Sequence, residues 1–434
     1  MPISIGSRSS NTKRTALSGR GSETAFKAVR FAALFLFVAA FACAQTAPLK
    51  FDLGCEPGDG YTKVAPSARY SDTAGYGFED PSATQPPYFF SIKVPQEGNY
   101  KVTLKMGDKT AATVTTVKAE LRRLMLSKVT TEPGQFVTRE IIVNVRQPQI
   151  PGGGEVRLKP RETTSEKWAW DDRITLEFTN SHPGVCGIEI AKDDAIPTIY
   201  IAGDSTSTDQ PLEPYNSWGQ MLTAFFKPDI AVANNGESGE SLRGFIGEHR
   251  LAKVMSQIKP GDWLFIQMGH NDQKERGEGV GAFTTYKADL ERFVAEARQH
   301  GATPVLITSM NRLTFDENGK ITNSLGDYPE AVRRVAREQN VALIDLNAMS
   351  KPFYEAMGPV DAHKAFAGKD TTHHSNYGSY EFARMIVQGI KDDHLPLVKY
   401  LVEVPPFDPA HPDAFDKFEI PAEPMGPLVK PYGN

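Results

Sequence analysis

The chain has 434 residues, of which 40% are hydrophobic and 23% are charged, and its formal net charge is −5. This composition is typical of a globular protein, and the length leaves room for two or three domains. A small negative charge without a long basic run excludes a general affinity for nucleic acid. It also gives no overall attraction to an acidic polymer, so an acidic substrate would have to be bound by local lysines and arginines.

The first 44 residues are predicted to be a secretory signal peptide. A segment with six basic residues and one acidic residue, 1–30, precedes an apolar run over 31–42. This run is short for a bilayer-spanning helix and is followed by Cys43 and Ala44, a small-residue pattern that favours cleavage after Ala44. We therefore expect a secreted or periplasmic protein with no membrane contact after cleavage. An uncleaved membrane anchor and a lipid-modified Cys43 are the alternatives.

Residues 45–193 are predicted to form a β-sandwich domain. Segments of alternating apolar and polar residues recur along it, separated by turns rich in Gly, Pro and Asn. They lie at 88–94, 99–105, 136–145, 173–178 and 188–190. Short alternating strands with regular turns are typical of two packed antiparallel sheets.

Two cysteines, Cys55 and Cys186, lie near the two ends of this first domain. An exported protein can form disulfides, and a bridge between these residues would close a long loop. The alternative that the sequence leaves open is a pair of buried free thiols.

From residue 194 to 395 the pattern changes to alternating strands and helices. Buried strands are predicted at short apolar runs, namely 198–202, 230–233, 263–268, 303–308 and 341–345. Apolar residues at helical spacing predict a helix that ends near Gly301, and further helices are expected at 331–339 and 377–390. Repeated β-α units indicate a parallel sheet with helices on both faces. The Pro-rich extension, 396–434, is expected to pack as an extended segment.

Four polar blocks lie at the ends of strands or before the last helix of this second domain. They are 203–206, 234–243, 269–272 and 370–373. The carboxyl ends of parallel strands are where α/β sheets bind ligands. Ester cleavage by a serine needs a nucleophile, a base, a group that orients the base, and donors for the oxyanion. The four blocks contain a candidate for each role.

Ser205 is the predicted nucleophile, His373 its base, and Asp370 the group that orients the imidazole. The predicted oxyanion donors are the backbone N–H groups of Ser205 and Gly239 and the side-chain amide of Asn271. Gly239 suits this role because no Cβ obstructs its N–H. Histidines and acids of the blocks could also ligate zinc, but the sequence lacks the spacings typical of zinc sites, so no metal ion is expected.

With these residues in this order, the second domain resembles the SGNH (GDSL-type) hydrolases. The family is named for Ser, Gly, Asn and His residues that match Ser205, Gly239, Asn271 and His373. Within it, the runs Ile-Ala-Gly-Asp-Ser-Thr, Gly-Glu-Ser-Leu-Arg and Met-Gly-His-Asn-Asp-Gln-Lys are most similar to rhamnogalacturonan acetylesterases. The resemblance selects His373 as the base rather than its neighbour His374.

This resemblance implies an SGNH-hydrolase (flavodoxin-like) three-layer α/β fold and an esterase that needs no cofactor. The implied substrate is an acetylated plant cell-wall polysaccharide, above all rhamnogalacturonan of pectin, and we expect a monomer. The upstream region, through the runs at 75–78 and 168–172, resembles galactose-binding-like sandwiches. An acetylxylan or broad carbohydrate acetylesterase is the alternative activity. A non-catalytic carbohydrate-binding surface protein is the alternative from another class.

Other residues have competing interpretations. Arg243 and Lys274 are candidates for binding a galacturonate carboxylate, and ion pairing within the protein is their alternative. His270 is expected to support the loop around Asn271, and Asp204 to bond loop backbone. The aromatic residues of the first domain could stack on sugar rings, although core packing is favoured for most of them. These aromatic residues are Tyr76, Phe78, Trp168 and Trp170.

Overall fold

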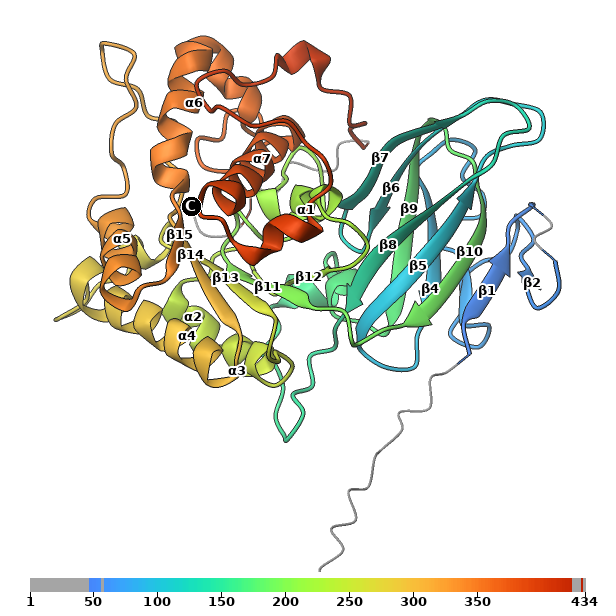
Figure 1. The fold of residues 1–434 in the computed structure, drawn as a ribbon, viewed down its shortest axis with the longest axis horizontal. Helices are drawn as coiled ribbons and strands as arrows, with labels where there is room; N and C mark the ends of the chain where they lie inside the picture. Colours follow the sequence, from blue (N-terminus) through green and yellow to red (C-terminus); the bar gives the residue numbers. More distant parts are fainter. Residues whose placement is uncertain (1–46, 56–57, 424–430, 432–434) are drawn as a thin grey trace, which may run out of the picture. The chain divides into compact units, whose positions relative to one another are not determined.

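The computed structural model describes residues 47–55, 58–423 and 431, and Figure 1 shows its fold. The predicted signal peptide, 1–44, lies outside these residues. Within the described part of the chain, no helix combines the length and the apolar character needed to span a bilayer.

The first half of the chain forms two five-stranded sheets that share one hydrophobic core (Figure 1). The first sheet has the order β2-β1-β10-β5-β8, with β1 (Leu49–Asp52), β2 (Thr62–Lys63), β5 (Gly98–Met106), β8 (Val137–Val145) and β10 (Val185–Lys192). The second has the order β3-β4-β9-β6-β7, with β3 (Tyr76–Phe78), β4 (Tyr88–Lys93), β6 (Thr113–Ala119), β7 (Arg123–Thr131) and β9 (Arg173–His182). Neighbouring strands are antiparallel apart from the parallel pair β1 and β2. The predicted sandwich is thus confirmed.

The residue pattern does not predict β6 and β7. In β6 all residues except Val114 are buried, although Thr and Lys make up most of the strand. Apolar and polar residues therefore do not alternate along it, and alternation is the pattern by which a half-exposed strand is recognised. A disulfide joins Cys55, after β1, to Cys186 in β10, with their Cα atoms 5.1 Å apart.

The second half of the chain contains a five-stranded parallel sheet. Its strands are β11 (Thr198–Gly203), β12 (Ala231–Asn234), β13 (Trp263–Gln267), β14 (Thr303–Ile307) and β15 (Ala342–Ile344). Their order is β12-β11-β13-β14-β15, and every neighbouring pair is parallel. This is the 2-1-3-4-5 order of flavodoxin-like sheets, whose ligands bind outside the carboxyl ends of the strands.

Helices cover both faces of this sheet because alternate strand residues point to opposite sides. The helices are α1 (Trp218–Leu222), α2 (Leu242–Gly247), α3 (Arg250–Met255), α4 (Lys287–Gln299), α5 (Tyr328–Gln339), α6 (Leu346–Asp361) and α7 (Asn376–Asp392). Ile199 and Ile201 pack with residues of α1, α6 and α7. Tyr200 and Ala202 pack with residues of α2, α3, α4 and α5. The three layers and the preceding sandwich confirm the predicted fold class.

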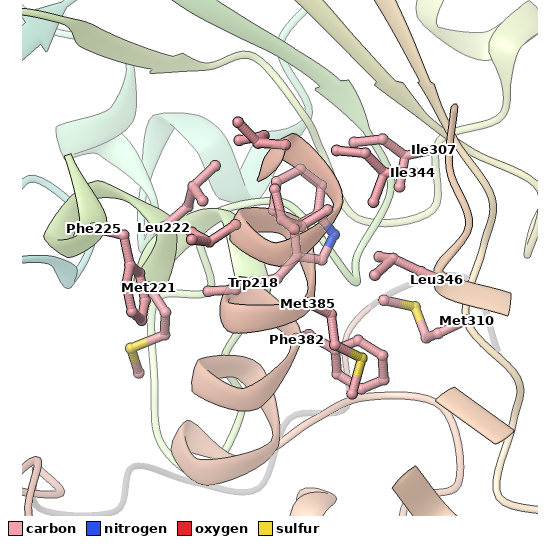
Figure 2. Packing of buried hydrophobic residues seen from close by; sticks show 14 of the residues in the cluster. Trp218, Met221, Leu222, Phe225, Ile307, Met310, Ile344, Leu346, Phe382 and Met385 are labelled. Carbon is pink, nitrogen blue, oxygen red and sulfur yellow. The ribbon is translucent and has the colours of Figure 1, made fainter. Parts of the chain in front are cut away.

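Figure 2 shows the core between the sheet and α1 and α7. Trp218 of α1 lies at its centre, close to Leu222 and to Ile307 of β14. The indole N–H of Trp218 donates to Gln267 Oε1 at 3.1 Å, so this large side chain is buried without an unpaired polar atom. Because Trp218 also packs on α7, the two helices that flank the site are held to the sheet by one apolar cluster.

The two halves of the described chain belong to one compact unit, 45–434, so the boundary at 193 and 194 stays a prediction. The β6–β7 hairpin of the sandwich contacts both α1 and the segment between β11 and α1. Arg122 donates to the carbonyl of Tyr215 at 2.9 Å, and Gln220 donates to the carbonyl of Leu121 at 2.6 Å. Up to residue 423, the described part of the C-terminal extension contains two short 3-10 helices, η7 (Pro396–Tyr400) and η8 (Phe415–Lys417), and otherwise runs without regular structure along the second half.

Candidate active site

The four polar blocks meet at the carboxyl edge of the parallel sheet. Ser205 follows β11, and Gly239 lies in the loop between β12 and α2. Asn271 follows β13, while Asp370 and His373 lie just before α7. Each block is brought to this edge by the strand or helix next to it, so residues up to 168 positions apart come into contact.

Ser205, His373 and Asp370 form a continuous hydrogen-bonded series. His373 Nε2 lies 2.8 Å from Ser205 Oγ, and His373 Nδ1 lies 3.0 Å from Asp370 Oδ2. The other carboxylate oxygen, Asp370 Oδ1, accepts the backbone N–H groups of Thr372 and His373 at 2.7 and 3.0 Å. One carboxylate therefore fixes both the imidazole ring and the turn that carries it.

The ionisation of Asp370 determines which tautomer His373 adopts. Burial raises the pKa of Asp370, but hydrogen bonds from the His373 ring and from two backbone N–H groups outweigh it and hold the pKa well below its usual range. An ionised carboxylate only accepts hydrogen bonds, so Nδ1 of His373 carries the proton. Nε2 is then the acceptor that faces the hydroxyl of Ser205.

The three predicted oxyanion donors lie around Ser205. Gln210 Nε2 donates to the carbonyl of Ser205 at 2.7 Å and to Ser238 Oγ at 3.2 Å, which places the Gly239 loop beside the serine. On the other side of that loop, Asn271 Nδ2 donates to the carbonyl of Glu240 at 2.9 Å. Among the described residues, no hydrogen bond takes the backbone N–H of Ser205 or of Gly239.

Two other polar residues of the blocks support the loops. Asp204 Oδ1 accepts the backbone N–H of Thr206 at 2.9 Å, and its Oδ2 lies 3.3 Å from Nδ1 of His270. The other ring nitrogen of His270, Nε2, lies 3.0 Å from the carbonyl of Met310. Both nitrogens of His270 are therefore engaged, and this histidine ties the β11 loop to the loop after β14, as expected for a supporting role.

His374 lies in an apolar environment. Its Nε2 is 3.0 Å from the hydroxyl of Tyr354, and its ring packs on Phe366 and Phe382 with centroids 4.8 and 4.6 Å away. Burial, assisted by the neighbouring His373 and His270, lowers the pKa of His374 to about 3. A histidine that stays neutral and points away from Ser205 does not compete with His373.

We expect His374 to make the fold acid-sensitive. Its folded-state pKa of about 3 lies below the usual 6.5, so the unfolded chain binds a proton first as the pH falls. Stability is lost below pH 6.5, and between pH 7.5 and 5 this site should remove about 2 kcal/mol from the free energy of unfolding. Urea unfolding of wild type and His374→Gln at both pH values measures this. A loss of equal size in the two proteins would contradict the prediction.

The structure places Arg243 and Lys274 near the site. Lys274 Nζ donates to Asn271 Oδ1 at 3.2 Å. Arg243 is half exposed, and its Nη1 lies 3.7 Å from Glu275 Oε2. Both cations thus have protein partners while lying beside the loops that surround Ser205.

The aromatic residues of the sandwich pack within the protein. Trp170 is 6% exposed, and its indole N–H donates to Glu162 Oε1 at 2.8 Å. Phe78 packs on Phe90, and Trp168 packs on Phe89. Core packing, the favoured interpretation, is what these contacts show.

The fold and this site define a hydrolytic enzyme of the three-layer α/β class. Residues 201–379 match the model of the GDSL-like Lipase/Acylhydrolase family. The chain belongs to this family and is a carboxylic ester hydrolase, which confirms the resemblance seen in the sequence.

Relatives of the chain include other esterases. It is 39% identical over 219 residues to the rhamnogalacturonan acetylesterase RhgT of Bacillus subtilis, an alignment that covers 47% of this chain and 94% of the relative. It is 27% identical over 372 residues to the uncharacterized esterase YxiM of the same organism, covering 79% and 90%. The crystal structure of YxiM superposes with a TM-score of 0.46 at 24% identity, over 80% of this chain and 99% of the other.

Proposed function

We propose that this protein is an exported serine esterase that removes acetyl groups from rhamnogalacturonan. The observation that carries the proposal is the series from Ser205 through His373 to Asp370, beside the backbone N–H groups of Ser205 and Gly239, which bond to none of the described residues. Relatives named rhamnogalacturonan acetylesterase support the substrate, one from Bacillus subtilis and another, at 25% identity over 214 residues, from Emericella nidulans. The basic and apolar pattern of 1–44 supports export, and a disulfide suits an oxidising compartment.

In the proposed reaction Ser205 Oγ attacks the acetyl carbonyl carbon while His373 Nε2 takes the hydroxyl proton. Asp370 remains ionised and stabilises the imidazolium that forms. Collapse of the tetrahedral intermediate breaks the bond to the sugar oxygen, which leaves with the proton from His373. Water, activated by the same histidine, then hydrolyses the acetyl-enzyme and releases acetate.

The negative charge on the carbonyl oxygen is accepted by the N–H groups of Ser205 and Gly239 and by the amide of Asn271. Asn271 can serve because an NH₂ group has two hydrogens, and only one of them is used by the carbonyl of Glu240. Removing one donor of this kind costs roughly 3–4 kcal/mol of transition-state stabilisation. Arg243 and Lys274 are proposed to bind the carboxylate of a neighbouring galacturonate.

Acetate release from three substrates tests this function. We expect the highest kcat/KM on acetylated rhamnogalacturonan, a lower value on neutral acetylated xylan, and the lowest on a small aryl acetate. Arg243→Ala should lower kcat/KM by about fivefold on the acidic polymer alone, because an exposed cation on a carboxylate contributes on the order of 1 kcal/mol. Equal or faster release from xylan would favour a broad carbohydrate acetylesterase instead.

A further inference from the structure

Two cations from the first half of the chain, which contains the β-sandwich and is called the sandwich half below, donate hydrogen bonds to the loop that carries Gly239. Lys159 and Arg161 belong to the connection between β8 and β9, where η1 (Pro160–Thr163) lies. Lys159 Nζ donates to the carbonyl oxygen of Ser238 at 3.0 Å, and Arg161 Nη2 donates to the same oxygen at 2.6 Å. A single backbone carbonyl near the nucleophile thus accepts hydrogen bonds from two positive charges.

That carbonyl belongs to the peptide whose N–H is the Gly239 donor. Among the described residues, cis peptide bonds precede only Pro87 and Pro214, so the Ser238–Gly239 peptide is trans. The C=O and N–H of a trans peptide point in opposite directions. Holding the carbonyl toward Lys159 and Arg161 therefore turns the N–H away from the sandwich half.

The opposite side of this peptide is the site. Gln210 links Ser238 Oγ to the carbonyl of Ser205, and Asn271 is bonded to the carbonyl of Glu240, so Gly239 lies between the nucleophile and the amide donor. Gly239 has φ = +84°, a conformation in which glycine is free of the strain that a Cβ would cause. The same freedom would let the peptide plane rotate if nothing held its carbonyl.

We propose that Lys159 and Arg161 are positioning residues for the oxyanion hole. They select the orientation in which the Gly239 N–H faces the oxyanion and, by drawing charge toward the carbonyl, strengthen that N–H as a donor. The inference rests on the proposed function. In this proposal, residues of the β-sandwich half help to form the oxyanion hole, so the sandwich does more than an attached sugar-binding module would.

The surroundings of the two cations favour this role over simple docking. Lys159 also pairs with the carboxylate of Glu240, and Arg161 with that of Glu237, so both cations bond to the same loop twice. The carboxylates are 2% and 5% exposed and the cations 19% and 24%, which limits screening by water. Each cation is thereby fixed in place while its remaining hydrogens reach the Ser238 carbonyl.

Kinetics of the full chain on an aryl acetate test the proposal through Lys159→Met, Arg161→Gln and the double variant. Each single change should lower kcat about tenfold with KM within about twofold, because an oxyanion donor acts in the transition state and its loss costs up to about 10²–10³ in kcat. Arg161→Lys, which keeps a cation at the carbonyl, should restore most of the kcat. The control is Lys192→Met, whose side chain is also 19% exposed and pairs with Asp194 on the sandwich.

Melting temperatures and circular dichroism identify the folded variants on which kcat is compared. Folded single variants with wild-type kcat, or with a raised KM alone, would overturn the proposal. If the double variant does not fold, the kinetics of the single variants are sufficient to test the proposal. A kcat loss of equal size in Lys192→Met would also overturn it. Wild type and Ser205→Ala in the same assay test the proposed function separately from the role of the two cations. An inactive wild type or an active Ser205→Ala would refute that function.

Discussion

Replacing Ser205 with alanine is expected to lower kcat for ester hydrolysis by roughly 10⁴-fold or more while leaving the fold intact. The change removes one atom, Oγ, which forms the covalent bond in the proposed mechanism. The serine is 3% exposed, and its Oγ lies 2.8 Å from His373 Nε2, so no other hydroxyl can take its place without moving the loop. The backbone N–H of residue 205 remains, and substrate binding should change little.

A serine-reactive phosphonate gives a second measurement of the same prediction. Wild type should become labelled at residue 205 and lose activity in parallel, whereas Ser205→Ala should stay unlabelled. Ser379→Ala is a matched control, because Ser379 is fully buried in α7 and its hydroxyl has no hydrogen-bond partner among the described residues. Labelling that persists in Ser205→Ala, or acetate release at the wild-type rate, would mean that the nucleophile lies elsewhere.

The parallel sheet could be predicted because its strands are buried on both faces. Such strands are continuous apolar runs in the sequence, as at 198–202 and 263–268, and each ends in a polar block. The carboxyl ends of parallel strands share one edge, so the order of the blocks was enough to bring Ser205 and Asn271 together. Asp370 and His373 could be paired because they lie within one turn of the chain.

The contacts between the two halves could not be predicted in this way. Arg161 and Lys159 lie in a charged segment that is indistinguishable from a solvated loop, and their partner Ser238 is 77 residues or more away. Helix α6 was not predicted because Pro352 and Pro359 interrupt its pattern; the chain accommodates the second of them with a kink at Gly358. Local patterns contain no information about partners that only the folded chain brings close.

Removing the charge of Arg123 is expected to destabilise the fold strongly. Arg123 lies at the start of β7, and its Nε donates to Asp209 Oδ2 at 2.6 Å, with both side chains 2% exposed. Arg123→Met leaves the buried carboxylate of Asp209 with the Asn234 amide on its other oxygen, at 2.8 Å, and with Arg146 as a neighbouring cation. Breaking a buried ion pair by removing one partner costs about 3–5 kcal/mol, which guanidinium unfolding would detect as a lower midpoint.

The double variant Arg123→Met with Asp209→Asn separates the interaction energy of the ion pair from the free-energy cost of burying each charge. With both charges gone, neither partner of this pair is left buried without the other, so the double variant should lose less stability than the two single variants together, by about 2 kcal/mol or more. Lys128 lies on the same strand as Arg123 and forms an exposed pair with Glu419 of the C-terminal extension. Lys128→Met, which breaks this pair, should cost at most about 1 kcal/mol. Additive single losses would show that Arg123 stabilises the junction through packing alone. Non-additive losses would show that a charge interaction binds the β6–β7 hairpin to the segment after Ser205. Because that interaction is buried between the two halves, the stability of the sandwich and the stability of the active site then depend on each other.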